Sequence, residues 1–126
     1  MSQAPQRYLD DFHLGEQFTA PPVTLRAEYF KMFSEITGDD HPIHDDADYA
    51  TAQGFEGPVA HGLLLLATTA FGACPASSQV HASMIAMLGT KAKFRKPAFV
   101  GTTLIRSFEV CAIEPSHNAN TNGCQN

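Results

Sequence analysis

The segment at residues 60–73, AHGLLLLATTAFGA, constrains the fold of this chain more than any other part of the sequence. Apolar side chains fall on every side of a helix over this range, and a helix of that kind is expected to be buried all round. The segment is too short and, with Thr68 and Thr69, too polar to span a bilayer. The rest of the chain therefore has to supply a cover for a central helix.

Strand-like sequence on both sides of this segment can supply that cover. We predict strands, from their alternating or β-branched residues, at residues 17–19, 83–88, 91–96 and 102–113. Pro21 and Pro22 argue against a longer first strand, because proline cannot donate to a ladder. A buried central helix with curved antiparallel strands is an α+β arrangement.

The chain length of 126 residues predicts one domain with one core, which we place at residues 1–113. The tail at 114–126, EPSHNANTNGCQN, has hardly any apolar group, so we expect disordered coil there. The N-terminus lacks the charged-then-apolar pattern of a secretion signal, and the three cysteines have no CxxC spacing. We therefore expect reduced thiols and a cytoplasmic location.

Residues 27–37, AEYFKMFSEIT, predict an amphipathic helix. Phe30, Phe33 and Ile36 recur at three-residue spacing and form one apolar stripe, while Ser34 faces away with the charged residues. Gly38 follows directly, and glycine is typical of the left-handed turn that ends a helix.

The polar stretch DDHPIHDDAD, residues 39–48, follows that helix. A second short helix is expected at residues 46–52, and helix capping accounts for its neighbouring aspartates. Pro42 stiffens the stretch, and a tight loop can turn Asp39 and His44 toward one point. A carboxylate and an imidazole aimed at one water form an acid/base pair. A hydrogen-bonded polar loop is the alternative, and the spacing does not separate the two.

A metal site is a third interpretation of the same stretch, and we do not favour it. Zinc sites use Cys or His at defined spacing, and calcium loops carry a central glycine. Neither pattern is present in residues 39–48. We predict no metal.

The stretch GPVAHGLLLLA, residues 57–67, leads into the central helix. Unpaired N–H groups at a helix start can hold an oxygen that gains negative charge, and Gly62 has no side chain to block its approach. Close packing of Gly62 against a neighbour is the alternative that this stretch alone favours. His61 is expected to be a packed, hydrogen-bonded residue.

Four of the eight basic residues fall within residues 91–96. On a strand, alternation places Lys91, Lys93 and Arg95 on one face, where they are either solvated or in contact with phosphates of a nucleotide-like carrier. The net charge of −5 argues against a nucleic-acid-binding protein.

Taken in order, these stretches resemble the MaoC-like branch of the hot-dog fold, the (R)-specific enoyl-CoA hydratases and acyl dehydratases. The loop motif G-D-x-N-P-[LIV]-H appears as GDDHPIH at 38–44, and G-P-[IV]-[VA]-H-G-[ML] as GPVAHGL at 57–63. The motif F-x-x-P-x-x-x-G-[DT]-T-L appears as FRKPAFVGTTL at 94–104, and YLDDFHLG at 8–15 resembles the family's opening. Three motifs in the right order are specific evidence.

The resemblance implies a hot-dog fold, with a curved antiparallel sheet wrapped around the central helix, and roles for particular residues. Asp39 and His44 match the pair that activates water for addition to a trans-2-enoyl-CoA, giving an (R)-3-hydroxyacyl-CoA, or for the reverse dehydration. Gly62 matches the position whose amide polarises the thioester carbonyl, with Val59 and His61 beside it in contact with substrate. The resemblance further implies coenzyme A phosphates at the basic segment, no metal or redox cofactor, and a homodimer.

Two departures from the family pattern stand out. The usual asparagine of the loop motif is His41, which we expect to support the loop by donating a hydrogen bond. The family also continues past residues 102–113 with a hairpin that completes the sheet, and residues 114–126 lack the alternation of a strand. We therefore expect the C-terminal strands to be missing. This expectation keeps a silent acyl-thioester-binding domain as an alternative, beside a hot-dog thioesterase.

A titrating His41 beside the pair is expected to influence the pH optimum of activity. We therefore predict that His41→Asn retains activity but moves the pH–rate profile, measured as kcat/KM for an enoyl-CoA against pH. An unchanged profile would count against this influence.

Overall fold

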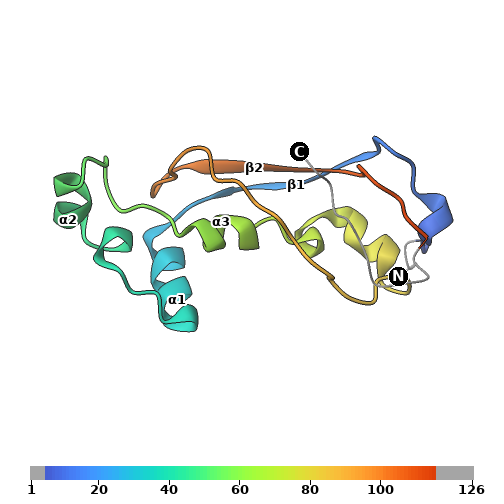
Figure 1. Ribbon diagram of the computed structural model, residues 1–126, viewed down its shortest axis with the longest axis horizontal. Helices are drawn as coiled ribbons and strands as arrows, with labels where there is room; N and C mark the ends of the chain where they lie inside the picture. The colour runs from blue at the N-terminus through green and yellow to red at the C-terminus, as the bar shows by residue number, and fades with distance from the viewer. Residues whose placement is uncertain (1–4, 116–126) are drawn as a thin grey trace. The chain divides into compact units, whose positions relative to one another are not determined.

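The computed structural model of the protein describes residues 5–115, which form an α+β arrangement (Figure 1). Within this range the elements are η1 (Leu9–Asp11), β1 (Gln17–Thr24), α1 (Ala27–Thr37), η2 (Pro42–His44), α2 (Ala47–Ala52), α3 (Gly62–Ala67), η3 (Phe71–Ala73), η4 (Pro75–Val80) and β2 (Thr103–Glu109), where η denotes a 3-10 helix.

The chain divides into two compact units. The first unit holds residues up to 21, residues 70–92 and those from 106 onward, and the second unit holds residues 22–69 and 93–105. The single domain at residues 1–113 stays a prediction. Apart from its first two residues, the tail at 114–126 lies outside the described residues.

Strands β1 and β2 form an antiparallel two-stranded sheet, in which the Leu25 amide continues the ladder by donating to the Thr102 carbonyl (2.8 Å). The strand predicted at residues 102–113 is confirmed as β2, which is shorter and covers Thr103–Glu109. The expectation that Pro21 and Pro22 stop the first strand is wrong. Within residues 5–115 β1 pairs with β2 alone, and an edge strand tolerates proline because only its paired side needs N–H donors.

Helix α1 has the bounds that the sequence predicts, Ala27–Thr37. It ends at Gly38, whose φ of 79° is left-handed and whose N–H donates to the Ser34 carbonyl (2.8 Å). The predicted apolar stripe is only partly buried. Phe30 is 1% exposed, whereas Ile36 is 81% exposed because it lies in the last turn, away from the packed face.

Helix α3 is much shorter than the buried helix predicted for residues 60–73. It covers six residues, none of them buried, and Leu63 is 64% exposed. The helix ends where the Thr68 and Thr69 hydroxyls donate to carbonyls three residues earlier (2.7 and 2.6 Å). Side-chain hydroxyls that bind nearby carbonyls compete with helix continuation. The all-round burial expected from composition is therefore wrong.

The strands predicted at residues 83–88 and 91–96, which were expected to cover the central helix, are wrong, because the structure has no strand at either range. Large apolar side chains in the first of them are exposed, with Ile85 at 97% and Met87 at 77%. Short strands depend on a partner for their hydrogen bonds, and none of the described residues pairs with these segments.

The second unit has its own small core, which anchors the segments around α1 and α3. Its buried members are Leu25, Phe30, Ala60 and Ala98. The Ala60 amide donates to the Ala98 carbonyl (2.8 Å), and Val59 forms an antiparallel bridge with Phe99. The entry to α3 is thereby fixed to the segment that follows the basic residues.

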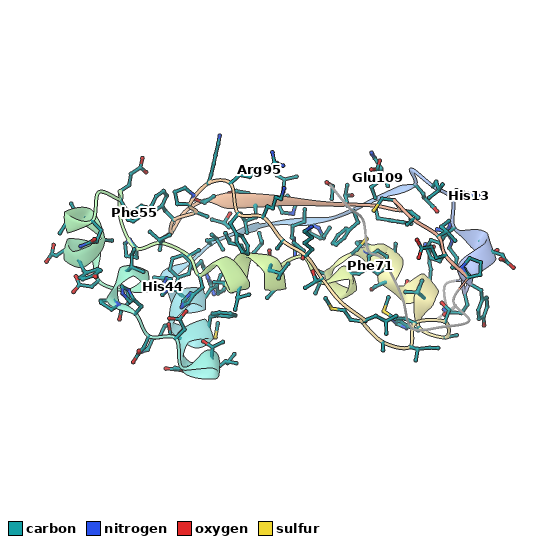
Figure 2. The ribbon with its side chains drawn as sticks, viewed as in Figure 1. His13, His44, Phe55, Phe71, Arg95 and Glu109 are labelled. Carbon is teal, nitrogen blue, oxygen red and sulfur yellow. The ribbon has the colours of Figure 1, made fainter. Side chains whose placement is uncertain are left out.

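The first unit packs phenylalanine rings around an apolar cavity of about 460 Å³. Phe71, labelled in Figure 2, contacts Phe18 and Phe108 edge to face, with ring centroids 5.7 and 5.5 Å apart. Arg7 binds Glu16 with both guanidinium nitrogens at 2.7 Å. This hydrogen-bonded pair lowers the pKa of Glu16 and raises the pKa of Arg7.

The cysteines differ from one another. Cys74 is a free thiol, 2% exposed, and its Sγ donates to the Thr19 carbonyl (3.3 Å). Cys111 is disulfide-bonded, so the expectation of reduced thiols is wrong at that position. Among residues 5–115, the helices are all too short to cross a bilayer.

Gly38→Ala is expected to lower the free energy of unfolding by about 1 kcal/mol, because a Cβ is disfavoured at a left-handed φ. Chemical denaturation followed by circular dichroism measures the change. Gly57→Ala is the control, since that backbone is outside the left-handed region and a Cβ there meets no atom within 4 Å. Equal stability of the two variants would contradict the assignment.

Candidate active site

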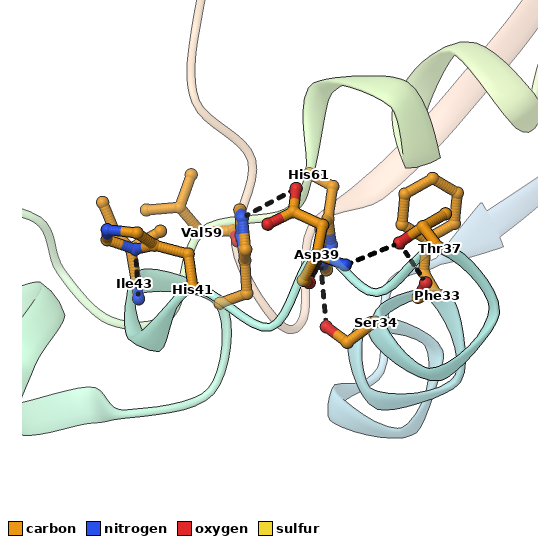
Figure 3. Close-up of polar contacts among 9 residues, drawn as sticks. Phe33, Ser34, Thr37, Asp39, His41, Ile43, Val59 and His61 are labelled. Atoms are coloured by element: carbon orange, nitrogen blue, oxygen red, sulfur yellow. Dashed lines mark hydrogen bonds and ion pairs between the residues drawn. The ribbon is translucent and has the colours of Figure 1, made fainter.

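Asp39 is positioned by the end of α1. The left-handed turn at Gly38 redirects the chain, and the Asp39 amide then donates to the Thr37 hydroxyl (3.2 Å), which itself donates to the Phe33 carbonyl (2.7 Å) (Figure 3). The Asp39 backbone is thus tied to the last turn of the helix. Its carboxylate remains accessible, with the side chain 54% exposed.

His44 is positioned by the 3-10 turn η2 and by the segment that enters α3. Pro42 opens the turn, and the His44 amide donates to the His41 carbonyl (3.0 Å). The ring Nδ1 lies 2.6 Å from the Val59 carbonyl. A carbonyl can only accept, so Nδ1 carries the proton and, in the neutral ring, Nε2 is left with a free lone pair.

The two side chains converge. His44 Nε2 lies 3.8 Å from Asp39 Oδ2, and the His44 side chain is 13% exposed. This distance is too long for a direct hydrogen bond, but it suits one water that donates to both atoms. The structure therefore brings together the two residues that the sequence proposes as an acid/base pair, while their catalytic role stays a prediction.

His61 packs behind the pair and is 2% exposed. Its Nε2 lies 3.1 Å from the Asp39 carbonyl and 3.0 Å from the Ser34 hydroxyl, and its ring stacks on His44 with centroids 3.6 Å apart. Burial lowers its pKa, an effect that His44 reinforces and the Asp39 carbonyl partly opposes. His61 is the packed, hydrogen-bonded residue that the sequence predicts. Its contact with substrate stays a prediction.

Ser34 contacts His61, so the prediction that it faces away from the packed side of α1 is wrong. It lies four residues after the buried Phe30, and residues four apart share a helix face. This spacing indicates that Ser34 lies on the packed face of α1, where its hydroxyl can bind His61.

His41 supports the loop, although not as expected. Its Nδ1 accepts a hydrogen bond from the Ile43 amide (3.1 Å) instead of donating one. An asparagine side-chain oxygen accepts from the amide two residues ahead in the same way. His41 therefore makes the local hydrogen bond that an asparagine at this position could make, and it also contacts Tyr49 edge to face.

Gly62 begins α3 against an aromatic ring. A Cβ at this position would lie 3.2–3.3 Å from three atoms of the Phe94 ring. Close packing, one of the two interpretations of this glycine, therefore has a direct structural basis. Stabilisation of a carbonyl by its amide stays a prediction.

The basic residues lie on irregular chain, so the predicted strand face at 91–96 is wrong. Lys91, Lys93 and Arg95 are all exposed, and Arg95 is labelled in Figure 2. Lys93 and Arg95 belong to the second unit with Asp39 and His44, whereas Lys91 belongs to the first. Contact with coenzyme A phosphates stays a prediction for all three.

A cavity of about 580 Å³ lies beside His44. Its lining includes the acidic residues Glu28, Glu35, Asp40 and Asp45 together with Lys31 and Ser34. Small ligands bind in concave sites of this size with a few convergent polar groups. The cavity therefore reaches one member of the pair, His44, and Asp39 is not among its lining residues.

The ligand atoms of Asp39, His44 and His61 lie within 4.8 Å of one another, so a metal site has to be considered. His61 Nε2 must keep its proton to bond the Asp39 carbonyl, and a protonated nitrogen cannot bind a metal. Two of these three donors are then left, fewer than a zinc site uses. The metal-free site stays a prediction.

Comparison with known proteins identifies the family to which this fold belongs. The family described as MaoC like domain matches residues 11–122. The chain therefore belongs to the MaoC-like family, and its α+β arrangement is the hot-dog fold of that family with a reduced sheet.

The relatives include enzymes. The chain is 32% identical over 81 residues to an (R)-specific enoyl-CoA hydratase from Aeromonas caviae, covering 64% of this chain and 58% of that protein. A solved (R)-hydratase from A. caviae has a TM-score of 0.65 at 26% identity and covers 80% of this chain and 74% of that one. A monoamine oxidase regulatory protein from Archaeoglobus has a TM-score of 0.78 at 28% identity, covering 89% and 75%. The chain thus spans little more than half the length of the curated hydratase that it matches.

The lowered pKa of His61 predicts a pH dependence of stability. Above the ordinary pKa of 6.5 both states are neutral, and the stabilising contribution is fully present. As pH falls below 6.5 toward the lower folded pKa, the unfolded state binds the proton first and stability is lost. His61→Gln is expected to flatten this decline, measured as the free energy of unfolding from about pH 8 to about pH 5.

The exposed His81 provides the matched control, because His81→Gln should leave the decline unchanged. A His61→Gln protein that keeps the slope of the parent would show that another group titrates.

Proposed function

We propose that the protein is a hydro-lyase that adds water to trans-2-enoyl-CoA to give (R)-3-hydroxyacyl-CoA, or that catalyses the reverse dehydration. Membership of a family of hydratases and dehydratases supports the reaction class. One observation carries the proposal for this chain: His44 Nε2 and an Asp39 carboxylate oxygen face one another 3.8 Å apart, while the other ring nitrogen of His44 is bonded to the Val59 carbonyl.

In the proposed hydration, one water donates its two O–H groups to His44 Nε2 and Asp39 Oδ2. One member of the pair takes a proton as the water oxygen bonds to the β-carbon, and a proton is returned to the α-carbon on the same side. The sum is the addition of one water, so no redox cofactor is needed. The Gly62 amide is proposed to stabilise the negative charge that builds up on the thioester oxygen.

The substrate is proposed to be held outside the pair by neighbouring groups of the second unit. Val59 flanks the reacting end, and the exposed Lys93 and Arg95 contact coenzyme A phosphates, the first as a point charge and the second as a forked hydrogen-bond donor. A homodimer in the cytoplasm remains part of the proposal.

The test is hydration of crotonyl-CoA, followed as loss of enoyl absorbance with free thiol measured in parallel. Asp39→Asn and His44→Gln are each expected to lower kcat by about 10²- to 10⁴-fold, because a side-chain amide can still bind the water but cannot take up its proton. Asp48→Asn and His81→Gln, both at exposed positions, should match the parent. Chiral analysis of the product should give the (R)-isomer.

The alternatives give different results in the same assay. A thioesterase releases thiol without prior loss of the enoyl group. A silent binding domain leaves both signals unchanged. If folded Asp39→Asn and His44→Gln proteins hydrate crotonyl-CoA as fast as the parent, the proposed function is refuted.

A further inference from the structure

His61 is the only buried polar side chain among residues 5–115. It is enclosed between α1 and the loop that follows: the Phe33 ring lies 4.8 Å from its centroid, and His44 lies 3.6 Å away at an interplanar angle of 18°. A polar ring in such a place requires a reason beyond packing, because an apolar ring fills the same space without desolvation.

The hydrogen bonds of His61 determine its protonation. The Asp39 carbonyl can only accept, so Nε2 carries the proton, which it shares with the Ser34 hydroxyl (3.0 Å). The opposite nitrogen, Nδ1, is buried and has no hydrogen-bond partner among residues 5–115. A ring retained for stability alone would not leave a nitrogen unpaired. The His61 ring therefore contributes through its Nε2–H, which donates a hydrogen bond, and through its face, which stacks on His44.

Both features act on the residues of the candidate pair. The Nε2–H holds the backbone of Asp39, and the ring face holds the plane of His44. Val59, two residues earlier on the same segment, holds the Nδ1 of His44 through its carbonyl. The short stretch at residues 59–61 therefore fixes the backbone position of Asp39. It also fixes the tautomer and the ring plane of His44.

We propose that His61 is a positioning residue without contact to the substrate. It sets the spacing of Asp39 and His44, and its stacking holds the His44 ring where Nδ1 meets the Val59 carbonyl. This inference rests on the proposed hydration for its kinetic consequence, whereas its structural consequence can be measured independently. The unpartnered Nδ1 is closed to solvent, which favours positioning over substrate binding.

The experiment combines kinetics with nitrogen-15 spectra of the histidine rings in the full chain. In the parent, His44 should carry its proton on Nδ1 and His61 on Nε2. His61→Gln keeps a donor but loses the stacking face, and His61→Phe keeps the face but loses the donor. Each is expected to lower kcat on crotonyl-CoA by about 100-fold with KM little changed, and to give His44 a mixture of tautomers.

The outcomes separate the two proposals. If the parent does not hydrate crotonyl-CoA, the proposed function fails, and the His44 tautomer alone decides the positioning role. If the variants raise KM and keep kcat, His61 binds substrate and the inference is overturned. It is equally overturned if kcat and the His44 tautomer are both unchanged.

A milder variant guards against loss of folding. Ser34→Ala removes one oxygen near His61 Nε2 and leaves its bond to the Asp39 carbonyl. It is expected to lower kcat by about fivefold, the effect of one hydrogen bond, and to shift the His61 nitrogen signal. Unchanged values of both would overturn the inference. His81→Gln should behave as the parent throughout.

Discussion

The hydrogen bond between His44 Nδ1 and the Val59 carbonyl, 2.6 Å long, is the constraint on which the candidate site depends. It joins the loop after α1 to the segment that enters α3, and it decides which ring nitrogen is free. Without it His44 has two tautomers available, and only one of them presents a lone pair to Asp39. The Val59–Phe99 bridge holds the same segment in turn, so the orientation of one imidazole depends on the packing of the second unit.

The parts of the fold with local signals could be predicted from the sequence. The stripe and terminal glycine gave the bounds of α1, and Asp46 caps α2 as its position indicates, by accepting from the Tyr49 amide. Parts that depend on distant partners could not be predicted. The length of α3 and the strands expected at 83–88 and 91–96 depend on what covers them, and β1 passes through its prolines only because it lies at an edge.

The candidate site shows the same division. The motif GDDHPIH indicates that Asp39 and His44 belong together, because a helix end and a proline restrict the chain between them to a few conformations. Their 3.8 Å separation and the tautomer of His44 depend on residues 59–61, whose contacts no local pattern reveals. Ser34 is an intermediate case. Its spacing from Phe30 along α1 indicates the helix face on which it lies, but its contact with His61 could not be predicted from the sequence.

The facing acceptors of Asp39 and His44 also define what else can occupy the site. Two lone pairs 3.8 Å apart, one of them on a charged group, repel each other unless a donor lies between them. A ligand that offers two hydrogens from a single atom, such as a primary amide or an amidine, is the geometric complement of this arrangement. A ligand would therefore gain most from an amino group placed between these two acceptors, and a carboxylate at that point would be excluded by charge.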